Sequence, residues 1–469
     1  MIGIKAGEIR VTLGNQDSPD FFSIKAERRA LSKLAKHPNI CLNFGTSFVY
    51  AKLMASPEKA SYNRLLVSKD IFKQLFVPDS NDIGVSISQN KVVFGPLIGI
   101  FVSGWETENL AQGTCKNKYF YRYIKVCREL NAICCFFSLQ DISWEERKIK
   151  GWIFQDKAAA GKKWTSRLLP IPTVVYDRCF GARGKEDGYE LRSQLLNVSG
   201  VTVFNAMPKL RKWETYELLR TYPEIQDCLP KTLPYTGAEE LAELLTKPGR
   251  VYLKPDGLSK GKGIFTIGRS PSGGFTIRHR GPEANEIFRI DSLDELEKLF
   301  EPYIERGGGY LMQEEVPLAR YNGKKFDMRV LCQKDIDGQW IIGGIAVRVA
   351  ARRSIVTSPR SGGSVITWPH ALQSVFSQQQ DQPDGIASKV TDIAFRICGI
   401  IEQHFGCCGE LGLDMGIDDQ GKVWVIEVNA KPLKVSLKRL RDPELLQLVH
   451  ANPIRFAYFL GCKPYPGAD

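Results

Sequence analysis

The feature that most constrains this chain is a predicted β-hairpin near its C-terminus. Two apolar runs lead to Asp414 and Asn429, and residues 418–421 between them supply the Asp and Gly of a turn. Side chains two apart on a strand share a face, so the hairpin brings Asp414 beside Glu427 and Asn429. An ordinary hairpin with a wet polar face is the alternative, but Glu427 and Asn429 lie among Val and Ile, where an unpaired charge is costly. Two carboxylates and an amide oxygen suit Mg²⁺ or Mn²⁺.

A second feature is a glycine-rich segment between two β-prone runs. The run 251–253 ends at Lys254, and three glycines follow within nine residues, accompanied by Lys260 and Lys262. Backbone N–H groups of such a turn can approach an anion, and the lysines supply positive charge. The spacing matches neither a P-loop nor a dinucleotide-binding glycine motif. A plain hairpin with a flexible tip remains an alternative to phosphate binding.

Composition excludes several classes of protein. The 469 residues suggest two or three domains, and no apolar run reaches the length of a membrane span. The first residues show no secretory leader pattern, so we expect a cytoplasmic protein. The twelve cysteines are scattered without a C-x-x-C pair, which indicates neither a disulfide framework nor a zinc site. A net charge of +12 without a recognition motif does not predict nucleic-acid binding, and it suits a protein that holds a triphosphate and anionic substrates.

The pattern of helix-prone and β-prone runs divides the chain into three parts. Residues 1–105 contain short β-prone runs and some helical stretches, and predict a small mixed α/β domain without catalytic residues. Residues 106–210 alternate helix and strand, which predicts a parallel sheet with covering helices. Residues 211–469 carry both features described above, and a small lid-like unit is expected at about 249–316.

The order of these features resembles the ATP-grasp superfamily. The resemblance is carried by the lysine-ended strand, the glycine-rich loop, a Gln-Glu-Glu-Val linker, an Asp-Met-Arg strand and the final Asp…Glu-x-Asn. The whole chain more narrowly resembles the YheC/YheD family of endospore coat-associated ATP-grasp proteins, including residues 95–100 and 211–216. The resemblance implies an α+β protein, in which an ATP-grasp fold is preceded by a parallel-sheet α/β domain and a small mixed N-terminal domain. In the superfamily, the domain that precedes the nucleotide-binding part helps to form the acceptor site.

The resemblance also assigns roles to single residues. Asp414, Glu427 and Asn429 would bind Mg²⁺ (or Mn²⁺), and the backbone of residues 314–316 would bind the edge of adenine, with one Glu near the ribose. A solvated lysine at the end of a helix is the alternative for Lys212. The residues assigned to ATP are Lys212, Lys254, Gly257, Lys260, Gly261, Gly263, Gln313, Glu314, Glu315 and Val316.

Two arginines are the candidate catalytic residues. Arg329 shares a strand face with Asp327, and Arg348 lies on the next β-prone run. A guanidinium suits the equatorial oxygens of a phosphoryl group during transfer, although surface salt bridges would explain each arginine as well. The basic, Ser/Gly-rich loop 352–363 is either a substrate loop or simply a mobile one. It departs from related ligases, which often carry Asn ahead of the Gly-Gly, because this chain has Ser358 there.

These assignments predict an ATP- and Mg-dependent ligase that joins a carboxylate to an amine through an acylphosphate and releases ADP. The alternatives are a catalytically silent ATP-binding component of the spore coat, and a kinase that uses the same site. The carboxylate and amine substrates are not identified by the sequence. The resemblance adds spore-coat association, with coat proteins as partners, to the expected cytoplasmic location.

Overall fold

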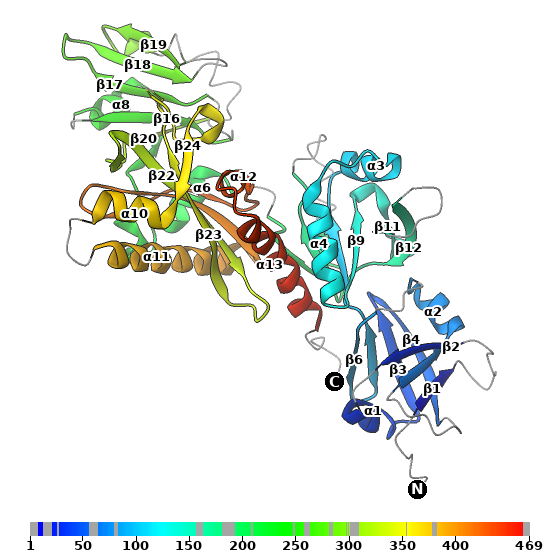
Figure 1. Ribbon diagram of the computed structural model, residues 1–469. Coiled ribbons are helices and arrows are strands. Elements are labelled where there is room, and N and C mark those ends of the chain that lie inside the picture. The colour runs from blue at the N-terminus through cyan, green and yellow to red at the C-terminus, as the bar shows by residue number, and fades with distance from the viewer. Residues whose placement is uncertain are drawn as a thin grey trace.

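The computed structural model contains four β-sheets that follow one another along the chain (Figure 1). The structure describes the chain from Glu8 to Cys462 except residues 13–20, 26–27, 56–63, 79–82, 156–162, 181–192, 208–209, 247–248, 258–262, 281–284, 297, 299, 301–308, 353 and 378–381. The first and third sheets lie at opposite ends of an elongated molecule (Figure 1). Within the described part of the chain, no helix has the length and apolar character needed to cross a membrane.

The first sheet has the strand order β2-β5-β1-β4-β3-β7-β6 and mixes parallel with antiparallel pairs. Some of the short β-prone runs expected within residues 1–105 form strands, among them β6 and β7. The elements are β1 (Glu8–Thr12), β2 (Phe21–Lys25), α1 (Arg28–Leu34), β3 (Asn39–Phe44), β4 (Ser47–Ala55), β5 (Arg64–Ser68), α2 (Lys69–Leu75), β6 (Val85–Ser88) and β7 (Lys91–Phe94).

The second sheet contains the parallel core predicted from the helix–strand alternation, in the order β9-β8-β13-β14. The antiparallel strands β10, β11 and β12 extend it at one edge. Its buried residues, such as Phe137 and Leu169, belong to the same core as Phe44 and Phe94 of the first sheet. The elements are β8 (Leu97–Phe101), α3 (Gly104–Gln112), α4 (Lys118–Glu129), β9 (Ile133–Phe137), η1 (Leu139–Asp141), β10 (Ile142–Ser143), β11 (Lys148–Phe154), β12 (Trp164–Pro170), β13 (Val174–Asp177) and β14 (Thr202–Phe204).

The third sheet is antiparallel, with the order β15-β20-β16-β17-β18-β19, and has its own core around Phe265 and Phe300. The residue pattern at 292–304 also predicts a helix, and residues 297, 299 and 301–304 of this stretch lie outside the described part of the chain. The elements are α6 (Lys212–Leu219), α7 (Pro223–Gln226), β15 (Thr232–Pro234), α8 (Ala238–Leu244), β16 (Arg250–Pro255), β17 (Phe265–Arg269), β18 (Phe275–Arg280), β19 (Asn285–Ile290) and β20 (Tyr310–Glu314).

The fourth sheet has the order β24-β23-β22-β25-β26, and α10 and α11 cover one of its faces (Figure 1). Residues of α11 three or four apart, including Val390, Ala394 and Ile397, pack on Met328 and Leu413 of the sheet, so the helix follows from its apolar spacing. The elements are β21 (Arg320–Tyr321), β22 (Lys324–Lys334), β23 (Trp340–Val349), η3 (Pro359–Ser361), β24 (Ser364–Thr367), α10 (Trp368–Phe376), α11 (Gln382–Phe405), β25 (Glu410–Ile417), β26 (Val423–Asn429), α12 (Val435–Arg439) and α13 (Pro443–Cys462).

The last helix, α13, packs against both the second and the fourth sheets, and against α4 (Figure 1). The Asn-Pro pair at 452–453 suggests a helix start, but this prediction is wrong because Pro453 lies inside the continuous helix. Asn452 is buried, and its side-chain amide donates to Gln333 Oε1 at 3.1 Å. Burial of this stretch therefore outweighs the cost of a proline inside a helix.

Candidate functional site

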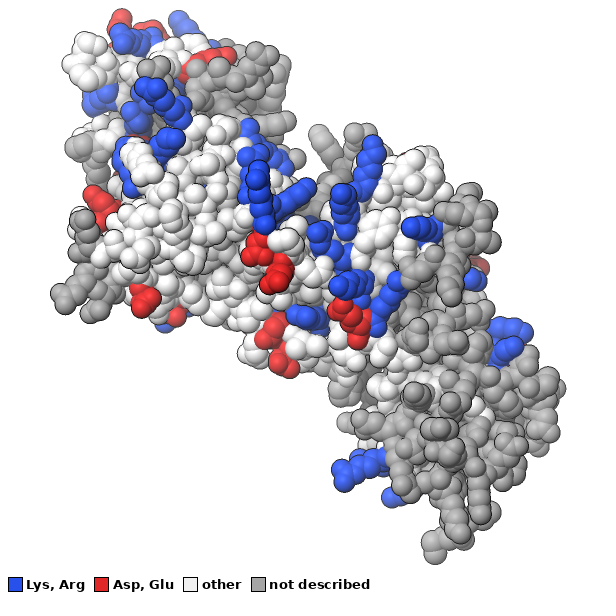
Figure 2. All heavy atoms as spheres, viewed as in Figure 1, with Lys and Arg blue, Asp and Glu red and all other residues white. Residues whose placement is uncertain are grey.

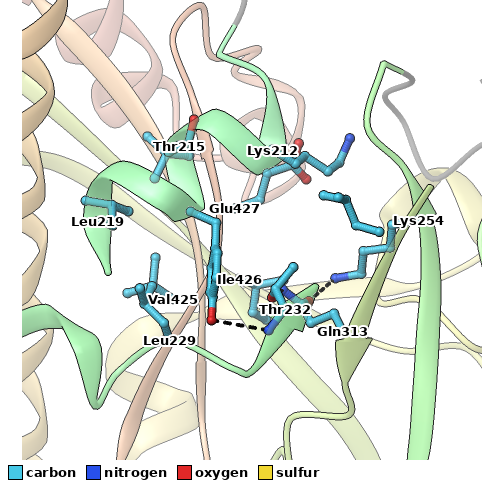
Figure 3. Close-up of a pocket in the computed structure, with 13 residues that line it drawn as sticks. Lys212, Thr215, Leu219, Leu229, Thr232, Lys254, Gln313, Val425, Ile426 and Glu427 are labelled. Atoms are coloured by element: carbon cyan, nitrogen blue, oxygen red, sulfur yellow. Dashed lines mark hydrogen bonds between the residues drawn. The ribbon is translucent and has the colours of Figure 1, made fainter. Parts of the chain in front are cut away.

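A narrow pocket of about 50 Å³ lies between the third and fourth sheets (Figure 3). Its walls come from α6, β15, β16, β20 and β26, which are distant in sequence. Lys212, Lys254, Gln313 and Glu427, all predicted site residues, line it together with apolar side chains such as Val425. The structure therefore brings the lysine-ended strand and the C-terminal hairpin to one place.

Lys254 is one of two lysines among the described residues that line this pocket, with Lys212. Its ammonium group donates to Gln313 Oε1, and Gln313 Nε2 donates in turn to Thr232 Oγ1 at 2.9 Å (Figure 3). Burial lowers the pKa of Lys254 to about 8, although the nearby Glu427 carboxylate acts in the opposite direction. Lys254 is thus held by the neutral side chain of Gln313 at the end of β16.

The start of α6 is fixed to the end of the same strand. Lys212 Nζ donates to the carbonyl oxygen of Pro255 at 3.1 Å, and the Trp213 N–H donates to Asp256 Oδ1 at 3.0 Å. A carboxylate at a helix N-terminus satisfies a backbone donor and suits the helix dipole. Asp256, which sequence analysis did not single out, therefore helps to hold the start of α6 and Lys212 at the end of β16.

A charged row crosses the fourth sheet from β22 to β26. Arg329 is in register with Asp414, and Asp414 is in register with Glu427, so these three side chains share a face. A β-bulge next to Asp414 makes Ile426 the extra residue, which keeps Glu427 opposite Asp414. The opposite face of the sheet is the apolar one covered by α11.

Asp414 is held by both candidate catalytic arginines. Arg329 donates from Nε at 2.5 Å and from Nη2 at 3.1 Å, and Arg348 Nη1 lies 3.3 Å from the same carboxylate. Arg348 also binds Asp327 through two hydrogen bonds of 2.7 and 2.6 Å. Burial raises the pKa of Asp414, but the two arginines more than offset this and hold it below its usual range.

The three predicted metal ligands fit a hard divalent cation. Asn429 lies two residues beyond Glu427 on the same strand and opposite Gly412, which neighbours the Arg329 guanidinium that holds Asp414. The amide nitrogen of Asn429 is buried without a hydrogen-bond partner, and turning the amide over would place its oxygen there as a ligand. In the part of the chain that the structure describes, no group of three His, Cys, Asp or Glu side chains forms an alternative metal site.

The predicted adenine segment is partly engaged within the protein. The Glu314 and Glu315 N–H groups donate to the carbonyl oxygens of Lys231 and Arg250 at 3.0 and 2.9 Å. This restricts the expected backbone contacts with adenine to Val316 and to carbonyl groups. The Glu315 carboxylate accepts a hydrogen bond from Lys325, a residue that sequence analysis missed.

The glycine-rich segment is described only at its two ends. Gly257 follows Asp256 directly, and Gly263 has a φ of +68° and accepts a hydrogen bond of 3.1 Å from the Tyr310 hydroxyl. The predicted phosphate-binding residues Lys260 and Gly261 lie outside the described residues.

A second charged cluster, which sequence analysis also missed, joins the second and fourth sheets. Glu410 on β25 is fully buried and accepts hydrogen bonds from Arg178 at 2.9 Å, Lys434 at 2.7 Å and the Tyr176 hydroxyl at 2.5 Å. Burial raises the pKa of Glu410, but Lys434 and Arg178 more than offset it and hold the value at about 2. A glutamate inside an apolar run was the one available signal for such a cluster.

Two sheets that enclose a lysine-bearing pocket, one of them crossed by the Arg–Asp–Glu row, are the architecture of the ATP-grasp class, and ATP-grasp proteins generally bind ATP and divalent metals. The family described as "YheC/D like ATP-grasp" matches residues 200–460. The chain belongs to this YheC/D-like ATP-grasp family, so the predicted family resemblance and α+β fold class are confirmed.

Two curated relatives come from Bacillus subtilis (strain 168). Endospore coat-associated protein YheD is 29% identical over 378 residues, which cover 78% of this chain and 79% of the relative. Endospore coat-associated protein YheC is 21% identical over 327 residues, which cover 69% of this chain and 87% of the relative.

The solved structures that match the chain are less similar to it in sequence than these two relatives. The VanG D-Ala:D-Ser ligase from Enterococcus faecalis is 13% identical with a TM-score of 0.43, covering 78% of this chain and 99% of that one. The D-alanine–D-alanine ligase from Bacillus anthracis, complexed with ATP, is 13% identical with a TM-score of 0.41, covering 78% of this chain and 98% of that one.

Proposed function

We propose that this protein is an ATP- and Mg-dependent ligase that joins a carboxylate to an amine and forms ADP. The observation that carries the proposal is the convergence of Lys254 from the third sheet with Asp414, Glu427, Arg329 and Arg348 on one face of the fourth. Such an arrangement of alternating charges suits a triphosphate that is bound between the two sheets.

Each side chain of the site has a distinct role in this proposal. Lys254 exchanges its bond with Gln313 for a phosphate oxygen, and Lys212 adds a second cation at the start of α6. When bound by Asp414, Glu427 and Asn429, Mg²⁺ would supply positive charge to the phosphates. The 50 Å³ pocket is smaller than the roughly 300 Å³ of ordinary ligand sites, so in this proposal it holds only part of the nucleotide.

The arginines offset the charge of the transferring group. Arg329 and Arg348 already meet at Asp414, so an arriving γ-phosphoryl group would share guanidinium donors that are in position. The γ-phosphoryl passes to a substrate carboxylate and ADP leaves; the amine then displaces phosphate and an amide bond forms. The described residues that line the pocket include no Cys or His, which agrees with a reaction driven by positioning and charge.

The acceptor is an anion, and the surface near the site suits one. Figure 2 shows Lys and Arg on both sides of the hollow between α12 and α4. Basic walls raise the local concentration of anionic substrates. The names of the two relatives support association with the spore coat and its proteins.

The decisive experiment incubates the purified protein with ATP, Mg²⁺ and pooled amino acids or cell-wall peptides. We expect ADP and phosphate, rather than AMP, together with an amide product detected by mass spectrometry. Formation of AMP would contradict the acylphosphate route. Tight Mg-dependent ATP binding without ADP formation on any acceptor would instead support the structural coat component, and a stable phosphorylated product would support the kinase.

A further inference from the structure

A second, larger cavity lies far from the nucleotide pocket, between α2 of the first sheet and β12 of the second. Its volume is about 610 Å³, within the roughly 300–1,000 Å³ of ligand-binding sites. Phe72 and Leu169, which line it, are buried in the one core that the two sheets share. Packing therefore fixes the two walls of this groove relative to each other.

The rim of the groove is basic. Lys69, Lys73 and Arg167 line it, and Lys148 lies with its Nζ 4.4 Å from the ring centroid of Phe76, another lining residue. Asp70 pairs with Lys73 at 3.5 Å, but both side chains are more than half exposed, so this pair is weak. The charge of the rim is complementary to an anionic ligand.

The groove also offers apolar surface. Leu168 is 48% exposed at its edge, although it neighbours the fully buried Leu169. Phe76 and Pro78 add further partly exposed apolar area. An apolar patch with a charged rim is typical of a site that binds a protein segment.

The wall formed by β12 is an edge strand. β12 pairs with β11 along its whole length, from Trp164 to Pro170, and among the described residues no other strand pairs with it. Figure 1 shows α2 beyond one end of this strand. An unpaired edge presents backbone N–H and C=O groups to which an extended peptide can add.

We propose that this groove binds an extended acidic segment of a partner protein, which adds to β12 as a further strand. The acidic side chains of that segment face Lys73 and Arg167, and an apolar side chain packs on Leu168 and Phe76. Alternation of side chains along a strand allows one segment to satisfy both surfaces. The site is independent of the nucleotide pocket, so it holds whether or not the proposed ligase activity does.

The test uses a fluorescein-labelled peptide of about eight residues with alternating Glu and Val, long enough to run along β12. Its binding to the full chain is followed by fluorescence anisotropy. We expect saturable binding that weakens about tenfold when salt rises from about 0.05 to 0.3 M. A Lys/Val peptide and an oligothymidylate of equal length should not bind at this site.

Variants locate the site. The Lys73→Glu/Arg167→Glu pair should weaken peptide binding at least about tenfold, and Leu168→Ala about threefold. Lys389→Glu, an exposed charge reversal on α11, is the matched control and should leave binding unchanged. Because all these side chains are exposed, each variant should fold, and a melting curve of each checks this.

Hydrogen exchange adds a readout on the strand itself, since bound peptide should slow exchange of amides between Ser166 and Leu168. The proposal is overturned by no peptide binding up to about 1 mM, the weak limit of specific association. Equal binding of the basic peptide or of the oligonucleotide, or unchanged affinity in the Lys73/Arg167 double variant, would overturn it too.

Discussion

At the scale of single residues, the charge of Lys254 determines what its pocket can hold. The ammonium group donates to the neutral side chain of Gln313, and its pKa of about 8 leaves it only partly protonated in mildly alkaline solution. A phosphate group would replace this neutral partner with an anionic one.

Replacing Lys254 with Ala should therefore weaken ATP binding by about 1.5–3 kcal/mol, the scale of one lost charge-assisted contact. Calorimetric titration of the variant with ATP and Mg²⁺ measures this. Lys389→Ala on α11 is the control. An affinity equal to that of the wild type in a folded variant would remove Lys254 from the nucleotide site.

ATP affinity should also depend on pH through this lysine. The protonated form binds phosphate, so affinity should be highest below pH 8 and fall as the pH rises through the pKa of about 8. The same titrations between about pH 7 and 9.5 test the sign, because this range spans that pKa. Lys254→Ala should show a flat profile there, and a wild type equally flat would contradict the assignment.

Glu427→Gln tests the proposed metal site with almost no change of shape. The variant loses an anionic ligand, so the Mg²⁺ concentration needed for activity should rise and turnover should fall by roughly two orders of magnitude or more. ADP release against Mg²⁺ concentration, beside a melting curve, measures both effects. Superimposable curves for variant and wild type would refute the metal role.

At the scale of elements, β25 depends on a residue without a side chain. A Cβ built on Gly412 would lie 2.7 Å from Pro432 Cβ and 3.3 Å from Arg329 Nη1. Gly412→Ala should therefore push Arg329 away from Asp414 and destabilise the protein by about 1–3 kcal/mol. Chemical denaturation measures the change. Gly385→Ala on α11 is the matched control, because its Cβ meets nothing within 4 Å and should be neutral or stabilising.

The elements also show which parts of the site could be predicted from sequence. The hairpin that carries Asp414 and Glu427 was predicted because its pairing is local and its turn residues are explicit. The clamp on Asp414 was not, because side-chain spacing gives no orientation for Arg329 and Arg348. The continuation of α13 through Pro453 depends on burial against other elements, which a local proline rule cannot include.

At the scale of the whole molecule, strand pairing shows which segments share a sheet, and composition does not. β8 belongs to the second sheet, although the sequence pattern changes only near residue 105. The domain boundaries therefore remain a prediction, which limited proteolysis can test. The Glu410 cluster was hidden because Arg178 and Lys434 come from distant parts of the chain. Long-range charge pairing has no signature in local spacing.

Two buried groups, His450 and Glu410, make the stability of the folded molecule sensitive to acid. Burial, reinforced by the positive charge of Lys434, lowers the pKa of His450 to about 3 from its ordinary value of about 6.5, so its neutral ring is favoured in the folded state. The unfolded chain takes up the proton first, and stability is lost as the pH falls from 6.5 towards 3. Glu410, whose pKa is about 2, adds a further loss as the pH falls from about 4.5 to 2.

We expect the free energy of unfolding to fall by about 1.6 kcal/mol between pH 6.5 and 5 through His450 alone. Denaturant titrations across this range measure the loss. His450→Gln keeps a polar side chain of similar size that does not titrate, so its free energy of unfolding should change less with pH. A wild-type stability that is constant down to pH 5 would exclude this role for His450.

The position of α13 has a consequence for biosynthesis. The second sheet is finished by β14, which ends at Phe204, yet α13 begins at Pro443 and supplies Ile454 and Phe456 to the same core. A ribosome adding about 5–20 residues per second needs some ten seconds or more to reach that helix. During this time the nascent second sheet exposes apolar surface, so its emergence is a step at which a chaperone would act.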